Sequence, residues 1–227
     1  MHFLSIEPST KIFSLAVSRG DKVLRWRNLA SGKVLEDSII PAVDRILKSA
    51  GVKFKQLDAF AIGLGPGSFT SLRVGLSTVK AFCLGSGKPV VGVCSLDVIA
   101  EGVRHIACDE ICVIVDARRN LLYSALYKNT KGNLKRQGDC RLTDLGTLLD
   151  SVHGRTLFVG DGVGLYRAEI KRACACTPLF APEKFWFPQA KHLAKLAFER
   201  LERGKYDDAG KLVPIYLYAS DCQVRKP

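Results

Sequence analysis

The sequence repeats one order of elements at an offset of 109 residues, and this repeat constrains the fold more than any other feature. An apolar run ends in an acid at Glu7 and again at Asp116. Each acid is followed by a short polar turn and two strand-like runs, and then by a helix, a strand and a helix. Two copies of strand–strand–strand–helix–strand–helix predict an α/β protein with two lobes of the same topology.

The apolar runs and turn residues place the elements of both copies. In the first copy we expect strands at Phe3–Glu7, Ile12–Ser18, Lys22–Leu29, Ala59–Leu64 and Val90–Cys94, and helices at Asp37–Ala50 and Phe69–Leu84. In the second we expect strands at Ile111–Asp116, Leu121–Tyr127 and around Leu134–Arg141, a short helix near Thr143, a glycine turn at Gly160–Gly162, a loop at Pro178–Pro188 and a last helix at Gln189–Arg203. The expected lobes are residues 1–100 and 101–227, with the final helix free to pack back on the first lobe.

Composition and charge narrow the class of protein. The chain has 227 residues, of which 47% are hydrophobic and 25% charged, as in ordinary globular proteins. No secretory signal is visible, and no apolar run reaches the roughly 20 residues of a membrane span, so we expect a cytoplasmic protein that does not enter a membrane. The net charge of +12 fits two interpretations, a lysine-rich solvated surface or a negatively charged partner such as RNA or an acidic protein face.

Eight cysteines are present, without a Cys-x-x-Cys pair, which argues against a zinc ribbon. In a cytosolic protein such cysteines are mostly buried or indifferent thiols. A disulfide between two of them stays open from the sequence.

A tight turn, Gly65-Pro66-Gly67, joins the strand at Ala59–Leu64 to the helix at Phe69–Leu84. Two glycines and a proline predict a turn in which a larger residue would clash. Ser68 or Thr70 is placed to cap the helix by accepting from its free N–H groups. A glycine turn at a helix N-terminus can also hold an anion, although most such turns are only turns.

The helix after this turn is apolar on two sides, and such a helix is buried on two sides. One side is formed by Leu72, Leu76, Val79 and Cys83, and the opposite side by the smaller residues Val74, Thr78 and Ala81. One side is expected to face the lobe core, and the other to meet the second helix, the other lobe or another chain. The candidate partner-interface residues are Ile39, Val43, Leu47, Arg73, Val74, Ser77, Thr78, Lys80 and Ala81.

The twelve residues from Gly65 to Leu76 closely resemble the signature of the TsaB (YeaZ) family. The resemblance covers Phe3 to about Ala100 and is thinner beyond, at Asp116–Arg118, Gly160–Gly162 and Pro214–Leu217. It implies a two-lobed actin-like fold of the ASKHA, ribonuclease-H-like class. It also implies a homodimer when alone and a heterodimer with TsaD, joined by the ATPase TsaE. In that assembly TsaD transfers threonylcarbamoyl to the adenosine beside the anticodon of tRNA.

An acid at the end of a first strand, followed by Ser and Thr, is the phosphate turn of actin-like ATPases and sugar kinases. Here the turn is Glu7-Pro8-Ser9-Thr10, whereas the family usually carries Asp-Thr-Ser-Thr. The glutamate is one methylene longer, and Pro8 removes a backbone donor. We therefore interpret Glu7, Ser9 and Thr10 as the vestige of a phosphate turn.

The remaining chemistry is sparse. No histidine pair stands at metal-ligand spacing, and neither a Walker A loop nor a Gly-x-Ser-x-Gly elbow is present. We expect a non-catalytic scaffold subunit with no metal and no cofactor of its own, so that ATP or ADP enters only in the complex. The alternatives are an active actin-like ATPase or kinase, and the peptidase activity suggested for relatives.

Overall fold

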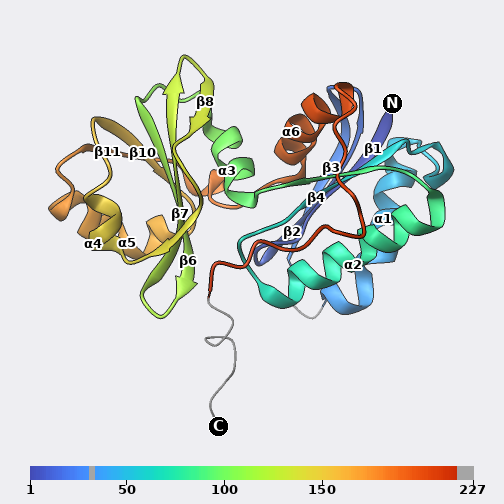
Figure 1. Cartoon of the computed structure of the whole chain (residues 1–227), viewed down its shortest axis with the longest axis horizontal. Helices are drawn as coiled ribbons and strands as arrows, with labels where there is room; N and C mark the ends of the chain where they lie inside the picture. The colour runs from blue at the N-terminus through green and yellow to red at the C-terminus, as the bar shows by residue number, and fades with distance from the viewer. Residues whose placement is uncertain (31–33, 219–227) are drawn as a thin grey trace, which may run out of the picture. The chain divides into compact units, whose positions relative to one another are not determined.

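The computed structural model describes residues 1–30 and 34–218 of the chain (Figure 1). It divides into two compact units. Unit 1 comprises Met1–Val98 and Pro188–Ile215, and unit 2 comprises Ile99–Phe187 and the described chain from Tyr216. Each unit is built around its own sheet.

Unit 1 contains a five-stranded sheet in the order β3-β2-β1-β4-β5. The strands are β1 (His2–Glu7), β2 (Ile12–Arg19), β3 (Lys22–Ala30), β4 (Ala59–Gly63) and β5 (Val90–Val93). β1 pairs antiparallel with β2 and parallel with β4, and β4 pairs parallel with β5. The central strands are buried along most of their length because both sheet faces are covered.

Two separate cores cover the faces of this sheet. On one face, α1 (Val34–Ala50) and α2 (Phe69–Ser86) pack against Leu4, Ile6 and Phe60. On the other face, α6 (Ala190–Glu202) packs against Phe3 and its neighbours, so the last helix of the chain belongs to the first sheet. β1 contributes side chains to both cores, because successive residues of a strand point to opposite faces of the sheet.

Unit 2 contains a six-stranded sheet in the order β11-β10-β6-β7-β8, with β9 also paired to β7. Its strands are β6 (Glu110–Arg118), β7 (Leu121–Thr130), β8 (Asn133–Arg136), β9 (Arg141–Thr143), β10 (Arg155–Val159) and β11 (Thr177–Phe180). Its helices α4 (Leu145–Leu149) and α5 (Gly162–Ala173) pack on a core that includes Cys112, Ile114 and Phe158. Asp144 caps α4, because its side chain accepts from the amide of Thr147 at 3.0 Å.

The predicted duplication is confirmed by the order of the strands. The first strand of each unit is central: β1 pairs antiparallel with β2 and parallel with β4, and β6 pairs antiparallel with β7 and parallel with β10. In the chain, α1 and α2 precede and follow β4, as α4 and α5 precede and follow β10. Glu7 is the last residue of β1, and Asp116 lies two residues before the end of β6, so both acids lie near the carboxyl end of the central strand.

Several predicted elements need correction. The run around Leu134–Arg141 is two short strands, β8 and β9, which pair with different parts of β7. The loop predicted at Pro178–Pro188 begins inside β11, which pairs parallel with β10. The helix α3 (Ser95–Val103), directly after β5, was not predicted.

Candidate functional site

The acid turn of unit 1 is closed by its own hydrogen bonds. The Glu7 side chain is fully buried, and its Oε1 accepts from the amide of Ser9 at 2.9 Å. The hydroxyl of Ser95, at the start of α3, donates to Oε2 at 3.0 Å. Burial raises the pKa of Glu7 above its ordinary value, although the hydrogen bonds from Ser9 and Ser95 act in the opposite direction.

Glycines make room for this buried carboxyl group. A Cβ on Gly63 would fall 2.7 Å from Oε1 of Glu7, inside contact distance. A Cβ on Gly75 would meet the ring of Pro8 at 2.7 Å, so α2 lies directly on the proline that follows the acid. The close approach of β4 and α2 to the turn therefore requires the absence of a side chain at both positions.

The Gly65-Pro66-Gly67 turn is bonded to the acid turn. The amide of Ser68 donates to the carbonyl oxygen of Ser9 at 2.8 Å, and the amide of Gly65 donates to Oγ of Ser95 at 3.1 Å. A Cβ on Gly67 would lie 2.9 Å from the carbonyl carbon of Ser9, which confirms that a larger residue would clash there. Gly65 adopts a φ of 89°, which favours glycine.

Ser68 occupies the N-cap position of α2, as predicted, but its side chain makes no cap hydrogen bond. Its hydroxyl lies 2.9 Å from Oγ of Ser71 instead. Thr70 lies inside the helix. The predicted capping by a side-chain oxygen is therefore wrong, because the two serine hydroxyls bond to each other.

These residues do not fit a nucleotide phosphate. The amides of Ser9, Gly65 and Ser68 all donate within the turns, and Pro8 has no amide hydrogen. The hydroxyl of Thr10 is engaged with the backbone of Ile12 at 3.2 Å. Oγ of Ser9 has no hydrogen-bond partner among the described residues, but Ser9 is 1% exposed. A phosphate group would have to displace bonds that the chain already makes.

The corresponding turn of unit 2 repeats one of these bonds. Oδ1 of Asp116 accepts from the amide of Arg118 at 2.8 Å, two residues on, as Glu7 does from Ser9. This acid is only half-buried, and it also pairs with the Arg118 guanidinium at 3.3 Å. Three residues of this turn adopt the left-handed backbone conformation, with φ of 70° for Arg118, 53° for Arg119 and 58° for Asn120.

The expected partner-interface residues of α2 lie in different environments. Arg73, Ser77 and Ala81 are exposed, whereas Val74 and Thr78 are half-buried, Val74 against the core. The guanidinium of Arg73 stacks on the ring of Phe69, 3.8 Å from its centroid. The ammonium of Lys80 donates to the carbonyl oxygen of Gly210 at 3.2 Å. The opposite side of α2, which begins with Leu72, is the buried one.

The three candidates on α1 are buried in unit 1. Ile39, Val43 and Leu47 are each at most 5% exposed and belong to the core under the sheet. The neighbouring Ile40 is 58% exposed instead. Ile40 is therefore an apolar side chain of α1 that another chain could contact.

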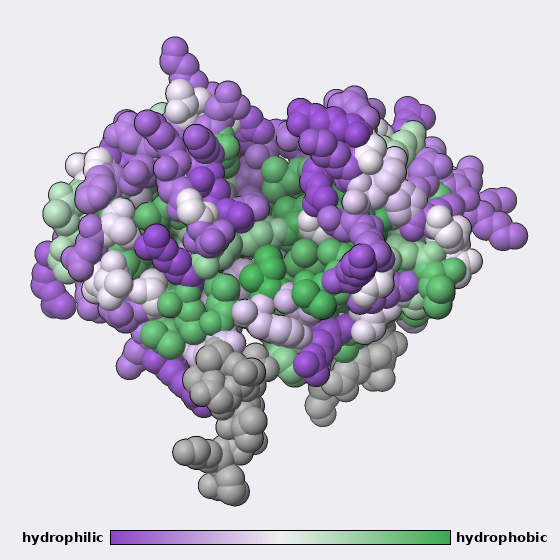
Figure 2. Space-filling view, in the orientation of Figure 1, coloured by the Kyte–Doolittle hydropathy of each residue, from purple (hydrophilic) through white to green (hydrophobic). Residues whose placement is uncertain are grey.

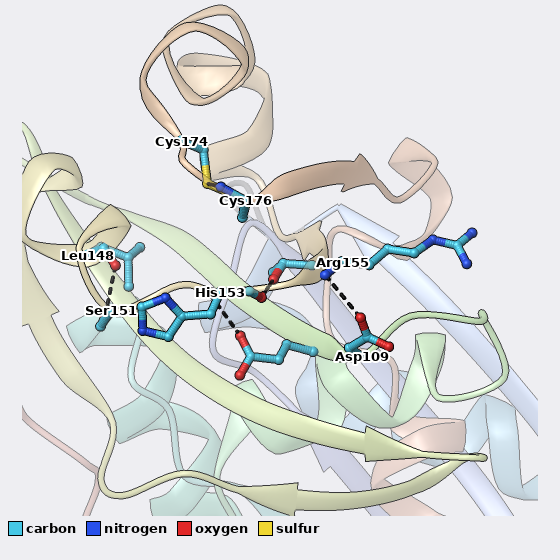
Figure 3. The surroundings of a disulfide bond; sticks show 9 residues. Asp109, Leu148, Ser151, His153, Arg155, Cys174 and Cys176 are labelled. Atoms are coloured by element: carbon cyan, nitrogen blue, oxygen red, sulfur yellow. Dashed lines mark hydrogen bonds between the residues drawn. A yellow bond between two sulfur atoms is a disulfide. The ribbon is translucent and has the colours of Figure 1, made fainter.

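Two cysteines differ from the expected free thiols. Cys174 and Cys176 form a disulfide between the end of α5 and the start of β11, with Cα atoms 5.2 Å apart (Figure 3). Cys83, Cys94 and Cys112 are buried and lie outside this disulfide, as expected of buried thiols. Burial raises the pKa of Cys112 most strongly, which makes this thiol unreactive.

Two features are absent from the described residues. Within residues 1–30 and 34–218, no group of three or more His, Cys, Asp or Glu side chains is arranged to hold a metal ion. In the same part of the chain, no helix combines the length and the apolar character of a membrane span.

Comparison with known proteins identifies the family of this chain. Residues 31–225 match the model of the family described as TsaD, tRNA N6-adenosine threonylcarbamoyltransferase. The tRNA threonylcarbamoyladenosine biosynthesis protein TsaB of Bacillus subtilis is 26% identical over 228 residues, which cover 99% of this chain and 97% of that protein. The chain belongs to this family and, within it, to the TsaB (YeaZ) group.

Other members of the TsaB group agree with this placement. The TsaB of Haemophilus influenzae is 32% identical over 122 residues, and this match spans about half of each chain, 53% of this one and 51% of the other. The structure of YeaZ from Pseudomonas aeruginosa is similar with a TM-score of 0.79 at 23% identity, and it covers 95% of this chain and 99% of YeaZ. The fold is the two-lobed actin-like fold that the resemblance implied.

Proposed function

We propose that this chain is a non-catalytic, cytoplasmic subunit of the system that makes threonylcarbamoyladenosine in tRNA, and that it supports a catalytic TsaD partner. The match to the TsaD family model and the names of the TsaB relatives support the pathway. TsaE is the expected ATPase of the assembly, and a homodimer is the expected state of the isolated chain.

The closed acid turn is the single observation that carries the non-catalytic role. An ATPase of this fold needs an accessible acid and free turn amides to hold metal-bound water and phosphate. Here Glu7 is fully buried and bonded to Ser9 and Ser95, and the amide of Ser68 is also engaged. A nucleotide in the assembly is therefore assigned to the partner proteins.

The exposed side of α2 is the proposed docking surface for TsaD and for a second copy of the chain. Ser77, Ala81 and Leu84 follow at helical spacing, and Leu84 is 90% exposed. The Arg73–Phe69 stack lies toward the start of the same helix. Small residues flanked by an exposed leucine allow a partner helix to approach closely. Lys80 and the buried residues of α1 contribute to unit 1 itself rather than to this surface.

The test is a reconstituted reaction containing tRNA, TsaD, TsaE and the threonylcarbamoyl-adenylate supply, with and without this chain. Modified adenosine should form only when the chain is present. Ala81→Glu should leave the chain folded, because Ala81 is exposed, and should weaken both TsaD binding and self-association. An unpaired charge enclosed in an interface costs on the order of 3–5 kcal/mol, which is about a thousandfold in affinity.

The matched control is Ala168→Glu, the same substitution at an exposed position of α5 in unit 2. It should leave both associations unchanged. Full modification in the reaction without this chain would overturn the proposed function. Nucleotide turnover by the isolated chain that disappears in Glu7→Gln would instead favour an active ATPase.

A further inference from the structure

Unit 2 contains a cavity that takes no part in the acid turns. It has a volume of about 620 Å³ and lies between the segment after α3, the β7–β8 hairpin and the start of β10. Four cationic side chains line it, Arg104, Lys128, Lys131 and Arg155, against the single carboxylate of Asp109. We call this cavity the Lys131 pocket.

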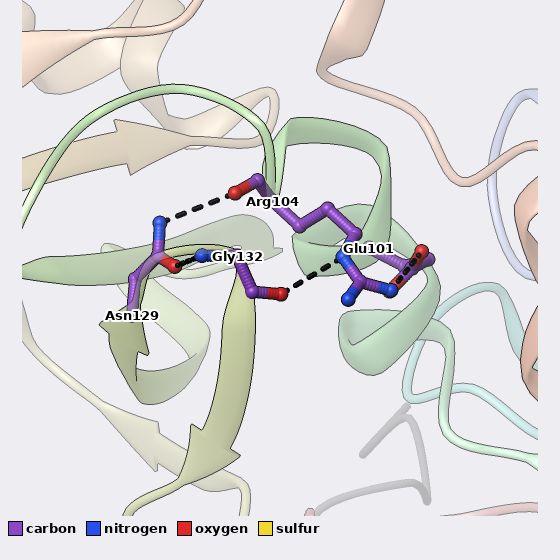
Figure 4. A network of polar contacts seen from close by, with 4 residues as sticks. All are labelled: Glu101, Arg104, Asn129 and Gly132. Carbon is purple, nitrogen blue, oxygen red and sulfur yellow. Dashed lines mark hydrogen bonds and ion pairs between the residues drawn. The ribbon is translucent and has the colours of Figure 1, made fainter.

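The walls of the Lys131 pocket are held by a network around Asn129 (Figure 4). The side chain of Asn129 is 9% exposed, and its Nδ2 donates to the carbonyl oxygens of Arg104 and Ile106 at 3.3 and 3.2 Å. Its Oδ1 accepts from the amide of Gly132 at 2.9 Å. Nε of Arg104 donates to the carbonyl oxygen of Gly132 at 2.9 Å, and its guanidinium pairs with Glu101 at 3.1 Å.

This network decides which kind of ligand the pocket can take. The acceptors around Asn129 are already occupied by donors of the chain. Oδ2 of Asp109 likewise accepts from the backbone amide of Arg155, at 3.1 Å. Because Asp109 is the single carboxylate among the described lining residues against four cationic side chains, a ligand that accepts hydrogen bonds finds more partners than one that donates them.

Three of the cations are exposed and have no ion pair among the described residues: Lys128, Lys131 and Arg155. In the strand register Lys128 lies between Glu110 of β6 and Lys135 of β8. Glu110 offsets part of the repulsion between Lys128 and Lys135, and the excess of positive charge comes from the cationic side chains that line the cavity. Figure 2 shows a mostly hydrophilic surface over the hairpin of β7 and β8.

We propose that the Lys131 pocket binds phosphate groups of the tRNA backbone. Lysine and arginine side chains are the usual partners of nucleic-acid phosphates. Among the described lining residues there is no Phe, Tyr or Trp, and the ring of the lining His105 already lies against that of Phe185, 5.9 Å between centroids, so the proposed contact is to the backbone. The choice of RNA over another phosphate-bearing ligand rests on the proposed function.

The test measures binding of unmodified tRNA to the full chain by fluorescence anisotropy over a range of salt concentrations. The pocket variant combines Lys128→Ala, Lys131→Ala and Arg155→Ala. The control variant combines Lys22→Ala, Lys205→Ala and Arg19→Ala, which removes the same charges at exposed positions of unit 1. Circular dichroism melting checks that both variants are folded.

The pocket variant should bind tRNA roughly tenfold or more weakly than the wild type, and the slope of log K against log salt should fall by about 1 for each phosphate that the variant no longer neutralises. The control variant should stay within about twofold. Equal weakening in both variants would mean diffuse attraction to a positive surface and would overturn the proposal.

Competition separates the two sources of phosphate. Inorganic phosphate or ATP at millimolar concentration should compete only weakly with tRNA at matched ionic strength. Saturable binding of these small anions at the pocket without binding of tRNA would overturn the assignment to RNA. Because no modification step is measured, this result stands apart from the reconstituted reaction, which tests the proposed function alone.

Discussion

Replacing Gly67 by alanine tests whether the two turns of unit 1 are locked together by close approach. The φ of Gly67 lies outside the left-handed region, so alanine meets no backbone strain there. The Cβ of the new alanine would lie 2.9 Å from the carbonyl carbon of Ser9 and 3.0 Å from the Cβ of Ser9. The Ser9 carbonyl group must therefore move, and its 2.8 Å hydrogen bond from the Ser68 amide is broken.

The cost has two parts. Leaving a buried carbonyl without its donor costs about 1–3 kcal/mol, and forcing an extra carbon into a packed site costs about 1–3 kcal/mol. Gly67→Ala should therefore destabilise the chain by about 2–6 kcal/mol, which lowers the melting temperature by about 4–24 °C for a protein of this size. Urea unfolding and circular dichroism melting measure both quantities.

Gly85→Ala provides the control within the following helix. Gly85 lies in α2, has no atom within 4 Å of an added Cβ, and adopts no left-handed φ. Alanine should be neutral there or stabilising by up to about 1 kcal/mol, because it is the better helix former. A melting temperature of Gly67→Ala equal to that of the wild type would refute the lock between Ser9 and the glycine turn.

Three further substitutions test other features. Burial raises the pKa of Glu7, so the contribution of this carboxyl group to stability is complete below the unfolded-state pKa and is lost as the pH rises through the folded-state pKa. The free energy of unfolding of Glu7→Gln, measured in urea relative to the wild type, should therefore increase from pH 5 to pH 8. A difference that stays constant with pH would contradict the burial argument. Asn129→Ala should cost about 1–3 kcal/mol in urea unfolding, because it removes the buried side-chain donor of two part-buried carbonyl groups, and a cost below about 0.5 kcal/mol would show that the network is not needed. Arg119→Gly should raise stability by up to about 1 kcal/mol, because glycine removes the steric cost of a left-handed residue; a lower melting temperature would mean that the arginine side chain stabilises the turn.

The sequence predicts the repeated topology well because acids, apolar strands and glycine turns recur in the same order. It fails at β11, since Pro178 indicates a break in the chain. Among the described residues β11 is an edge strand that pairs with β10 alone, and an edge strand tolerates proline. It also fails at α3, which has nine residues and follows β5 without a turn signal.

The state of the acid turn was harder to predict. The sequence shows that Pro8 removes a donor and that Glu7 is longer than the usual aspartate. It does not show that the hydroxyl reaching Glu7 comes from Ser95, 88 residues away, nor that the amide closing on Ser9 comes from Ser68. Such pairings depend on the packing of β4 and α2 against the turn, and no local pattern carries that information.

The closed turn determines whether the amount of folded chain depends on the nucleotide concentration in the cell. A protein that needs a ligand to complete a turn is stabilised in proportion to RT ln(1 + [L]/Kd), so its folded fraction follows the ligand concentration. Here the carboxyl group of Glu7 takes the place beside the Ser9 amide, within the same polypeptide. The turn of unit 1 is therefore completed by a side chain of the same polypeptide, whose effective concentration is fixed. The supply of folded subunit is then expected to stay constant when nucleotide levels fall.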